Sequence, residues 1–229
     1  MIKVSSAFLY QVLLMMTILP PLGALRRPLI ISSPRFTEHS INTYHPECPE
    51  RSEVLHQMAQ RMHDQGQVEL RLPSAEVDLE RFREAERVVR TVHSNEYVDE
   101  IRFLCAKGAR RPSPWDMDTY LSPASFETCL LAQSAWMDAV DAVMTGSKAA
   151  FALARPPGHH AERSQSMGFC IFNFAAGAAK YALEKYSLKR VGILDFDVHF
   201  GNGIADILCK EPNIRCIPSL LVFVLIYSY

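Results

Sequence analysis

The second half of the chain alternates short apolar strands with helices, and this pattern restricts the fold more than any other feature. Residues 149–154 and 191–195 read as strands, with a helix expected between them over residues 175–185. A helix at 205–208 and a strand at 214–217 continue the alternation. Strands joined through helices pair in parallel and place helices on both faces of their sheet. The sequence therefore predicts a three-layer α/β fold, with a parallel sheet between two layers of helices.

Helical spacing of apolar residues predicts three further helices in the first half, over residues 49–66, 94–108 and 122–146. Ser94 and Ser122 are the expected N-caps of the second and third helices, because a serine hydroxyl accepts hydrogen bonds from the first backbone amides. Proline follows Ser122, and proline suits the first turn of a helix. Glycine ends each of the three patterns.

Charge and cysteine content exclude several classes of protein. The chain has 24 basic and 25 acidic residues, a formal net charge of -1, so direct binding of nucleic acid or of an anionic membrane is not expected. Its six cysteines form no C-x-x-C pair, which argues against zinc-ribbon and thioredoxin-like folds. We interpret the cysteines as packed free thiols.

Polar residues follow both predicted strands of the second half. His159 and His160 come after the strand at 149–154, and Asp195, Asp197 and His199 come at the end of the next one. Ligands of parallel α/β sheets bind beyond the carboxyl ends of the strands. We therefore expect the two clusters to meet at one edge of one sheet.

The residue types in these clusters indicate hydrolytic chemistry on a metal. Asp197 and His199 are two residues apart, so their side chains share one side of an extended segment, and both are zinc ligands in proteins. Asp195 shares that side and is placed to orient a histidine. The alternative for this cluster alone is a solvated turn. Tandem histidines after a stiff Pro-Pro-Gly segment favour catalysis, with His159 and His160 as base and proton donor.

Several ordered motifs resemble the histone deacetylase family and, more broadly, the arginase–deacetylase fold, which includes acetylpolyamine amidohydrolases. They are Tyr44-His-Pro-Glu-Cys-Pro-Glu-Arg51, Val92-His-Ser-Asn-Glu-Tyr97, Asp118-Thr-Tyr-Leu-Ser-Pro123, Arg155-Pro-Pro-Gly-His-His-Ala161, Gly168-Phe-Cys-Ile-Phe-Asn173, Leu194-Asp-Phe-Asp-Val-His199 and Gly201-Asn-Gly203. The resemblance implies zinc-dependent hydrolysis of an N-acetyl amide, on lysine in a protein or on a polyamine.

The resemblance also implies a role for each cluster residue. Asp197 and His199 would be two of three zinc ligands, and His159 and His160 the acid–base pair. Asp195 would orient His159 and help to form a neighbouring monovalent-cation site, for K⁺ in this family.

Three more positions take roles from the resemblance. Asn202 would lie behind His160, and Gly168 and Phe169 would line the narrow channel that takes the acetylated side chain. A plain core aromatic is the alternative for Phe169. Lone histidines such as His93 are assigned no role.

The chain departs from the family pattern in two ways. The third zinc ligand and the oxyanion-stabilising tyrosine of the family lie further downstream than Tyr229, and Phe200 stands where a second histidine is usual. Two protein ligands hold zinc weakly, and losing oxyanion stabilisation costs about two to three orders of magnitude in rate. The sequence therefore predicts that residues 25–229 alone show no measurable deacetylation. The alternative to a zinc deacetylase is a truncated, non-catalytic isoform that acts by binding.

The expected organisation has four parts. Residues 1–24 have the layout of a signal or targeting peptide, with an uncleaved anchor or a wrongly assigned start as alternatives, so the cell compartment stays open. Residues 25–43 read as an extended linker, and 44–216 as a partial histone deacetylase domain. Residues 217–229 form an apolar tail too short for a helical membrane span, which suggests truncation or read-through.

Overall fold

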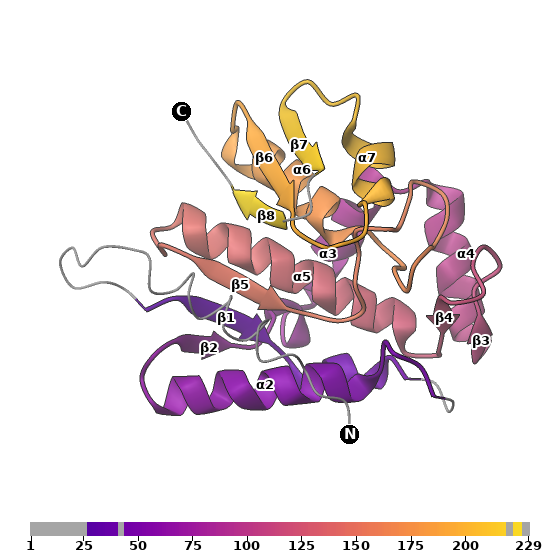
Figure 1. The fold of residues 1–229 in the computed structure, drawn as a ribbon, viewed down its shortest axis with the longest axis horizontal. Helices are drawn as coiled ribbons and strands as arrows, with labels where there is room; N and C mark the ends of the chain where they lie inside the picture. The colour runs from indigo at the N-terminus through magenta and orange to yellow at the C-terminus, as the bar shows by residue number, and fades with distance from the viewer. Residues whose placement is uncertain (1–26, 41–43, 219–221, 226–229) are drawn as a thin grey trace.

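A three-stranded parallel sheet lies between two layers of helices in the computed structural model, which describes residues 27–40, 44–218 and 222–225 (Figure 1). The middle strand β1 (Leu29–Ser32) pairs with β2 (Glu69–Arg71) on one side and with β5 (Ala150–Leu153) on the other. Helix α2 (Pro49–Asp64) covers one face of this sheet, and α5 (Ser125–Met144) covers the opposite face. The predicted three-layer α/β fold is confirmed.

The apolar run of β1 explains why this strand lies in the middle. Leu29 and Ile31 pack into the hydrophobic cluster on the α5 side, whereas Ile30, between them, packs with Ala59 of α2 on the other. A strand buried on both faces needs consecutive apolar residues rather than an alternating pattern. Residues 25–43, read as a linker from sequence, thus contain a buried strand, and a 3₁₀ helix at Pro34–Glu38 follows it.

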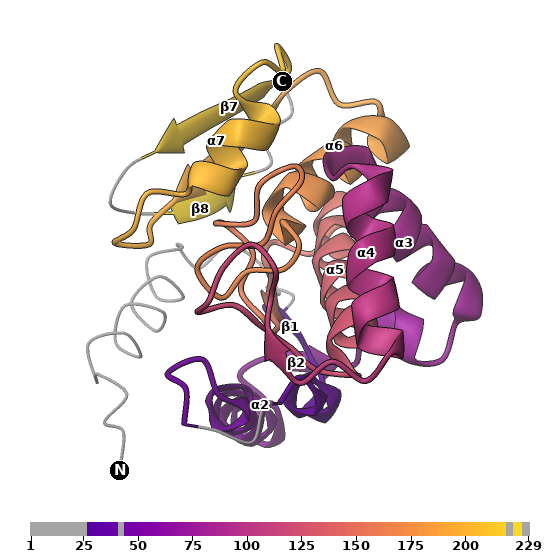
Figure 2. The same ribbon diagram turned by 90° about the vertical axis from the view of Figure 1, so that its right-hand side faces the viewer.

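A group of helices packs against α5 on the side away from β1. It consists of α3 (Leu79–Val92), α4 (Asn95–Ala106) and α6 (Phe174–Tyr186), as Figure 2 shows. Helix α3 was not expected from the sequence. Asp78 caps it by accepting hydrogen bonds from the amides of residues 80 and 81, and the face that includes Val88 and Val92 is buried.

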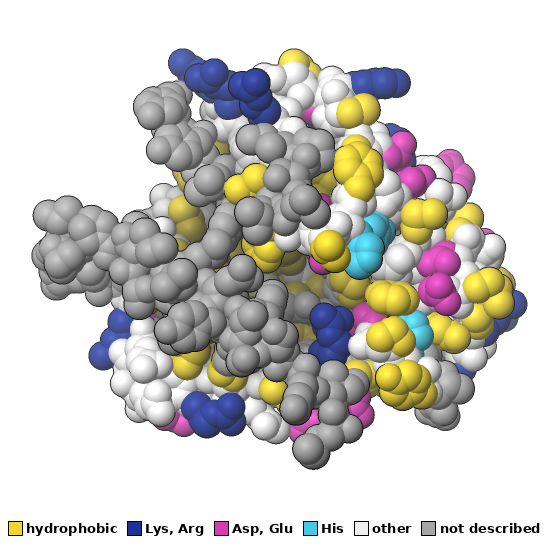
Figure 3. Space-filling model, viewed as in Figure 1, with side chains coloured by type: hydrophobic (Ala, Val, Ile, Leu, Met, Phe, Trp, Pro, Cys, Tyr) yellow, Lys and Arg dark blue, Asp and Glu magenta, His cyan; other side chains and the backbone are white. Residues whose placement is uncertain are grey.

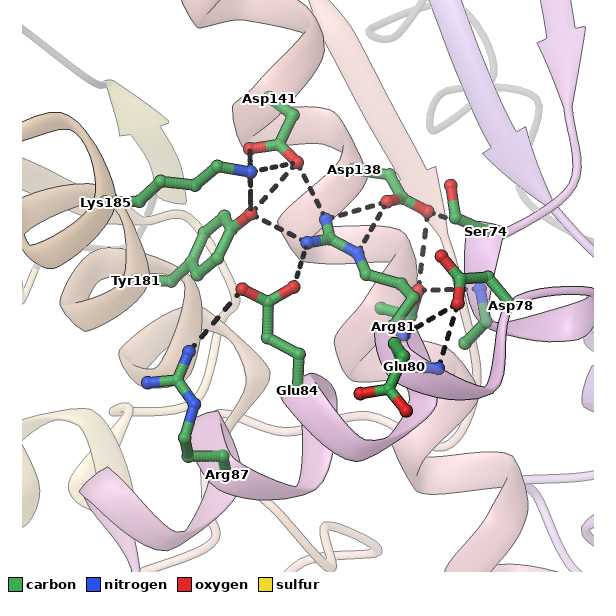
Figure 4. A network of polar contacts seen from close by, with 12 residues as sticks. Ser74, Asp78, Glu80, Arg81, Glu84, Arg87, Asp138, Asp141, Tyr181 and Lys185 are labelled. Carbon is green, nitrogen blue, oxygen red and sulfur yellow. Dashed lines mark hydrogen bonds and ion pairs between the residues drawn. The ribbon is translucent and has the colours of Figure 1, made fainter.

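A buried arginine ties helices α3, α5 and α6 together (Figure 4). The guanidinium of Arg81, on α3, donates to Asp138 at 2.8 Å and to Asp141 at 2.9 Å, both on α5. It also donates to the hydroxyl of Tyr181, on α6, at 2.7 Å. Burial lowers the pKa of Arg81, but the hydrogen bond to Tyr181 and the charge of Asp138 outweigh it and raise the pKa overall. Arg81 therefore stays charged inside the helix layer.

A second sheet carries the predicted cluster of Asp195, Asp197 and His199 at the end of its middle strand. Strand β6 (Val191–Asp195) pairs in parallel with β7 (Ile214–Pro218) and antiparallel with β8 (Val222–Leu225). The expectation that both polar clusters share one sheet edge is therefore wrong within the described residues, because β7 and β8 occupy both edges of β6. Part of the predicted apolar tail forms β8, and its valine- and phenylalanine-rich sequence suits a strand.

Short elements complete the fold: a 3₁₀ helix at Ser74–Glu76, the two-stranded ribbon β3 (Arg111–Pro112) and β4 (Tyr120–Leu121), and α7 (Asn202–Leu208). The N-cap at Ser94 is confirmed, since its hydroxyl accepts from the amide of Tyr97. Ser122 is not an N-cap; its backbone amide donates to the hydroxyl of Ser125 at 2.7 Å, and α5 begins after Ala124.

The part of the chain that the structure describes holds no helix long and apolar enough to cross a membrane. The predicted leader, residues 1–24, lies outside the described residues.

Candidate active site

The loop after β5 starts from a buried ion pair. Arg155 and Glu47 are each less than 5% exposed, and the guanidinium donates to both carboxylate oxygens, one of them at 2.9 Å. Arg155 also donates to the carbonyl of Phe36 at 2.9 Å. Its peptide bond to Pro156 is cis. These contacts fix the loop that leads to the tandem histidines against the N-terminal part of the fold.

His159 lies against the end of β6. Its Nδ1 is 2.9 Å from Oδ2 of Asp195, a carboxylate that is 6% exposed. Gly201 makes this approach feasible, since a Cβ atom at this position would lie 2.1 Å from the same carboxylate oxygen. The two clusters that the sequence singled out thus meet, although their strands belong to separate sheets.

His160 lies beside His159, with 3.9 Å between the ring centroids. Its Nδ1 is 2.6 Å from Oδ1 of Asn202, at the start of α7. Burial lowers the pKa of His160, and the hydrogen bond to Asn202 opposes this shift only in part. His160 is therefore neutral at pH 7, as a proton acceptor must be.

Asp197 and His199 form a more exposed pair. Oδ1 of Asp197 is 2.9 Å from Nδ1 of His199, and their side chains are 48% and 72% exposed. Burial raises the pKa of Asp197, but the hydrogen bonds from the backbone and ring of His199 lower it overall. The His199 ring centroid is 5.9 Å from that of His160. Figure 3 shows one face of the molecule, on which histidine side chains lie beside hydrophobic and acidic ones.

The donor types of this pair suit zinc, but the number of donors does not complete a site. A carboxylate and an imidazole are both zinc ligands, and catalytic zinc normally has three protein ligands. The described residues contain no group of three histidine, cysteine or acidic side chains that could hold a metal ion. Asp197 and His199 can thus supply two ligands of a zinc site. The K⁺ site expected beside Asp195 stays a prediction.

Gly168 and Phe169 form a strained turn against His160. Both have positive φ, 54° and 71°, a conformation that costs a bulky residue about 1–3 kcal/mol. The amide of Gly168 donates to Asp116 and that of Phe169 to Thr119, each at 2.9 Å, which holds the turn in place. A Cβ atom on Gly168 would lie 2.5 Å from the ring of His160. The turn therefore forms a wall directly beside the tandem histidines.

Two residues without a sequence-based role support this loop. His93, 1% exposed, lies with Nδ1 2.9 Å from the carbonyl of Glu162, and its Nε2 accepts from the amide of Asn173 at 2.9 Å. The side chain of Glu162 in turn accepts from Asn202 at 2.7 Å. Both residues lie inside or next to the quoted motifs, but only the fold shows what they contact.

Comparison with known proteins identifies the family. Residues 45–220 match the histone deacetylase domain. The chain belongs to the histone deacetylase family. It is 38% identical over 186 residues to protein slr0245 of Synechocystis sp., covering 81% of this chain and 58% of that protein. It is 36% identical over 176 residues to polyamine deacetylase HDAC10 of Homo sapiens, covering 74% of this chain and 25% of that protein.

A solved structure agrees with this assignment. The crystal structure of the HDA15 HD domain matches this histone deacetylase family member with a TM-score of 0.69 at 29% identity, over 83% of this chain and 53% of that one. The chain thus spans little more than half the length of slr0245 and of the HDA15 HD domain, and a quarter of HDAC10.

Proposed function

We propose that this site belongs to a zinc-dependent N-acetyl amidohydrolase that acts on acetylated lysine or on an acetylated polyamine. The observation that carries the proposal is the pair of hydrogen-bonded histidines, His159 on Asp195 and His160 on Asn202, beside the donors Asp197 and His199. Family membership supports the reaction class, and the polyamine deacetylase among the relatives supports an acetylated amine as substrate.

Zinc bound at Asp197 and His199 would polarise the acetyl carbonyl and lower the pKa of a water molecule. The protein's own contribution is to move protons. His160, whose pKa partial burial lowers, accepts the proton that the attacking water loses. His159 donates from Nδ1 to the Asp195 carboxylate, which orients its ring beside that of His160.

The wall beside the histidines selects a slender substrate. The backbone amide of Phe169 donates a hydrogen bond to the hydroxyl of Thr119. The Phe169 ring lies edge-on to that of His45, with 4.8 Å between the ring centroids. Apolar walls suit the methylene groups of an acetylated lysine or polyamine. The half-exposed Met167 and the exposed Phe200 add apolar surface near the same loops.

The test is deacetylation of an acetyl-lysine peptide and of an N-acetylated polyamine by the chain loaded with zinc. We expect His160→Ala to abolish any turnover and zinc chelation to do the same. Lys148→Ala, which changes an exposed residue in the turn before β5, is the matched control and should leave turnover unchanged. Turnover that survives His160→Ala would contradict the proposed mechanism.

A non-catalytic binding role is the second candidate. It is favoured by the count of zinc donors among the described residues, which is two rather than three. A chain that binds the acetylated peptide without turning it over, with zinc present in excess, would favour this second candidate over the first.

A further inference from the structure

Glu162 lies at the end of a chain of hydrogen bonds that leads to the ring of His160. It follows the tandem histidines by two residues and is half-buried. One carboxylate oxygen accepts from Nδ2 of Asn202 at 2.7 Å, and the other accepts from Nε2 of Gln165 at 2.6 Å. The carbonyl oxygen of the Asn202 side chain faces Nδ1 of His160 at 2.6 Å.

The chemistry of these groups fixes the direction of every bond. An ionised carboxylate only accepts hydrogen bonds, so Asn202 must turn its NH₂ group toward Glu162. The carbonyl oxygen of the same amide then points at His160 and can only accept. Nδ1 of His160 must therefore carry the hydrogen, which leaves the lone pair on Nε2.

We propose that Glu162 is a positioning residue, which orients the Asn202 amide and thereby sets the tautomer of His160. This inference rests on the proposed function, in which His160 accepts a proton. Without Glu162 the amide of Asn202 is free to turn over and present its NH₂ group to Nδ1. The hydrogen of the neutral ring then moves to Nε2, and the atom that accepts the proton is blocked.

The other contacts of Asn202 are too weak to replace Glu162. Its Nδ2 lies 3.4 Å from the carbonyl oxygen of His160, which is long for an N–H···O bond, and 3.3 Å from the sulfur of Met167, which is a weak acceptor. His159 needs no such help, because the Asp195 carboxylate accepts from Nδ1 directly. The two histidines thus reach the same tautomer by different means.

The experiment reads the tautomer directly. The whole chain, labelled with ¹⁵N-histidine and without added metal or substrate, is measured by NMR at alkaline pH, where imidazoles are neutral. His160→Gln assigns the signal. We expect the Nδ1–H tautomer of His160 in the parent chain, its loss in Glu162→Ala, and its recovery in Glu162→Gln, whose amide oxygen still accepts from Asn202. Arg163→Ala, an exposed neighbour, is the matched control and should change nothing.

The result that overturns the inference is an Nε2–H tautomer in the parent chain, or an Nδ1–H tautomer that persists in Glu162→Ala. The His159 signal reports whether the loop is intact. If the His159 signal is lost in Glu162→Ala, the variant Glu162→Leu, which keeps the side-chain volume, is measured in its place and judged by the same two outcomes. Since no zinc, substrate or turnover enters the measurement, the result of the deacetylation assay tests the proposed function separately and does not alter this test.

Discussion

The loop that carries His159 and His160 is anchored on several sides, whereas the segment that carries Asp197 and His199 is exposed. Arg155 and His93 hold the loop from its two ends through buried hydrogen bonds. Asp197 and His199 bond chiefly to each other. The described residues thus build an anchored half with the tandem histidines and an open half with the two proposed zinc ligands. Changes in the first half should cost stability, and changes in the second should cost metal binding alone.

Replacing Arg155 should have the largest effect. Arg155→Met removes the buried partner of the Glu47 carboxylate and leaves it the longer contact to the exposed Arg51 at 3.8 Å, and breaking a buried pair costs about 3–5 kcal/mol. Denaturant unfolding measures the loss. Arg35→Met breaks the exposed pair with Glu38 and should stay within about 1 kcal/mol. Equal losses for the two variants would contradict the comparison.

Gly168→Ala should have the next largest effect and lower the free energy of unfolding by about 2–3 kcal/mol. It combines a positive φ with a Cβ atom that would lie 2.5 Å from the His160 ring, so the ring or the turn must move. Any turnover should fall with it. Gly108→Ala is the matched variant, because Gly108 also has positive φ but has open space around its Cβ; it should cost only about 1 kcal/mol. A smaller loss of stability in Gly168→Ala than in Gly108→Ala would contradict the close packing of Gly168 against the His160 ring.

Acid should destabilise the anchored half. Burial lowers the pKa of His39, whose backbone carbonyl accepts from Arg155, to about 3 and that of His93 to about 4. The unfolded chain then binds protons at these histidines below pH ~6.5 while the folded chain does not, so stability present at neutral pH is lost as pH falls. His93 alone should contribute a loss of roughly 2 kcal/mol by pH ~5. His93→Gln keeps a hydrogen-bond donor and an acceptor, so it should make the free energy of unfolding depend less steeply on pH. An unchanged slope would contradict this prediction.

The smallest effect on stability is expected at Asp197. Asp197→Ala should change the free energy of unfolding by no more than about 0.5 kcal/mol, because the side chain is half exposed. Zinc affinity, measured by calorimetry, should fall at least about tenfold. Asp195→Ala makes the same change two residues earlier at a buried carboxylate and should cost about 1–3 kcal/mol. Equal losses of unfolding free energy in the two variants would contradict the view that Asp197 lies in an open, weakly packed segment.

The sequence predicted most elements of the fold and brought the right clusters together. Strand β6 and the cap at Ser94 follow from periodicity and capping chemistry. Helix α3 escaped prediction because its buried face includes the charged Arg81, which reads as surface until its partners on α5 and α6 are known. The prediction that both polar clusters lie at one sheet edge was wrong because the pairing of β6 with β8 depends on contacts that no local pattern encodes.

The site was predicted less completely than the fold. His159, His160, Asp197 and His199 stand out because motifs mark them, and their roles came from the resemblance. Glu162 acts through an amide 40 residues further along the chain, so its contribution cannot be seen in the sequence.

One guanidinium shared by three helices also bears on how the molecule opens. Arg81 cannot leave its place without breaking its hydrogen bonds to Asp138 and Asp141 of α5 and to the hydroxyl of Tyr181 at once. Helices α3, α5 and α6 should therefore exchange their amide hydrogens as one cooperative unit rather than fray one by one. These three helices would then behave as a single foldon.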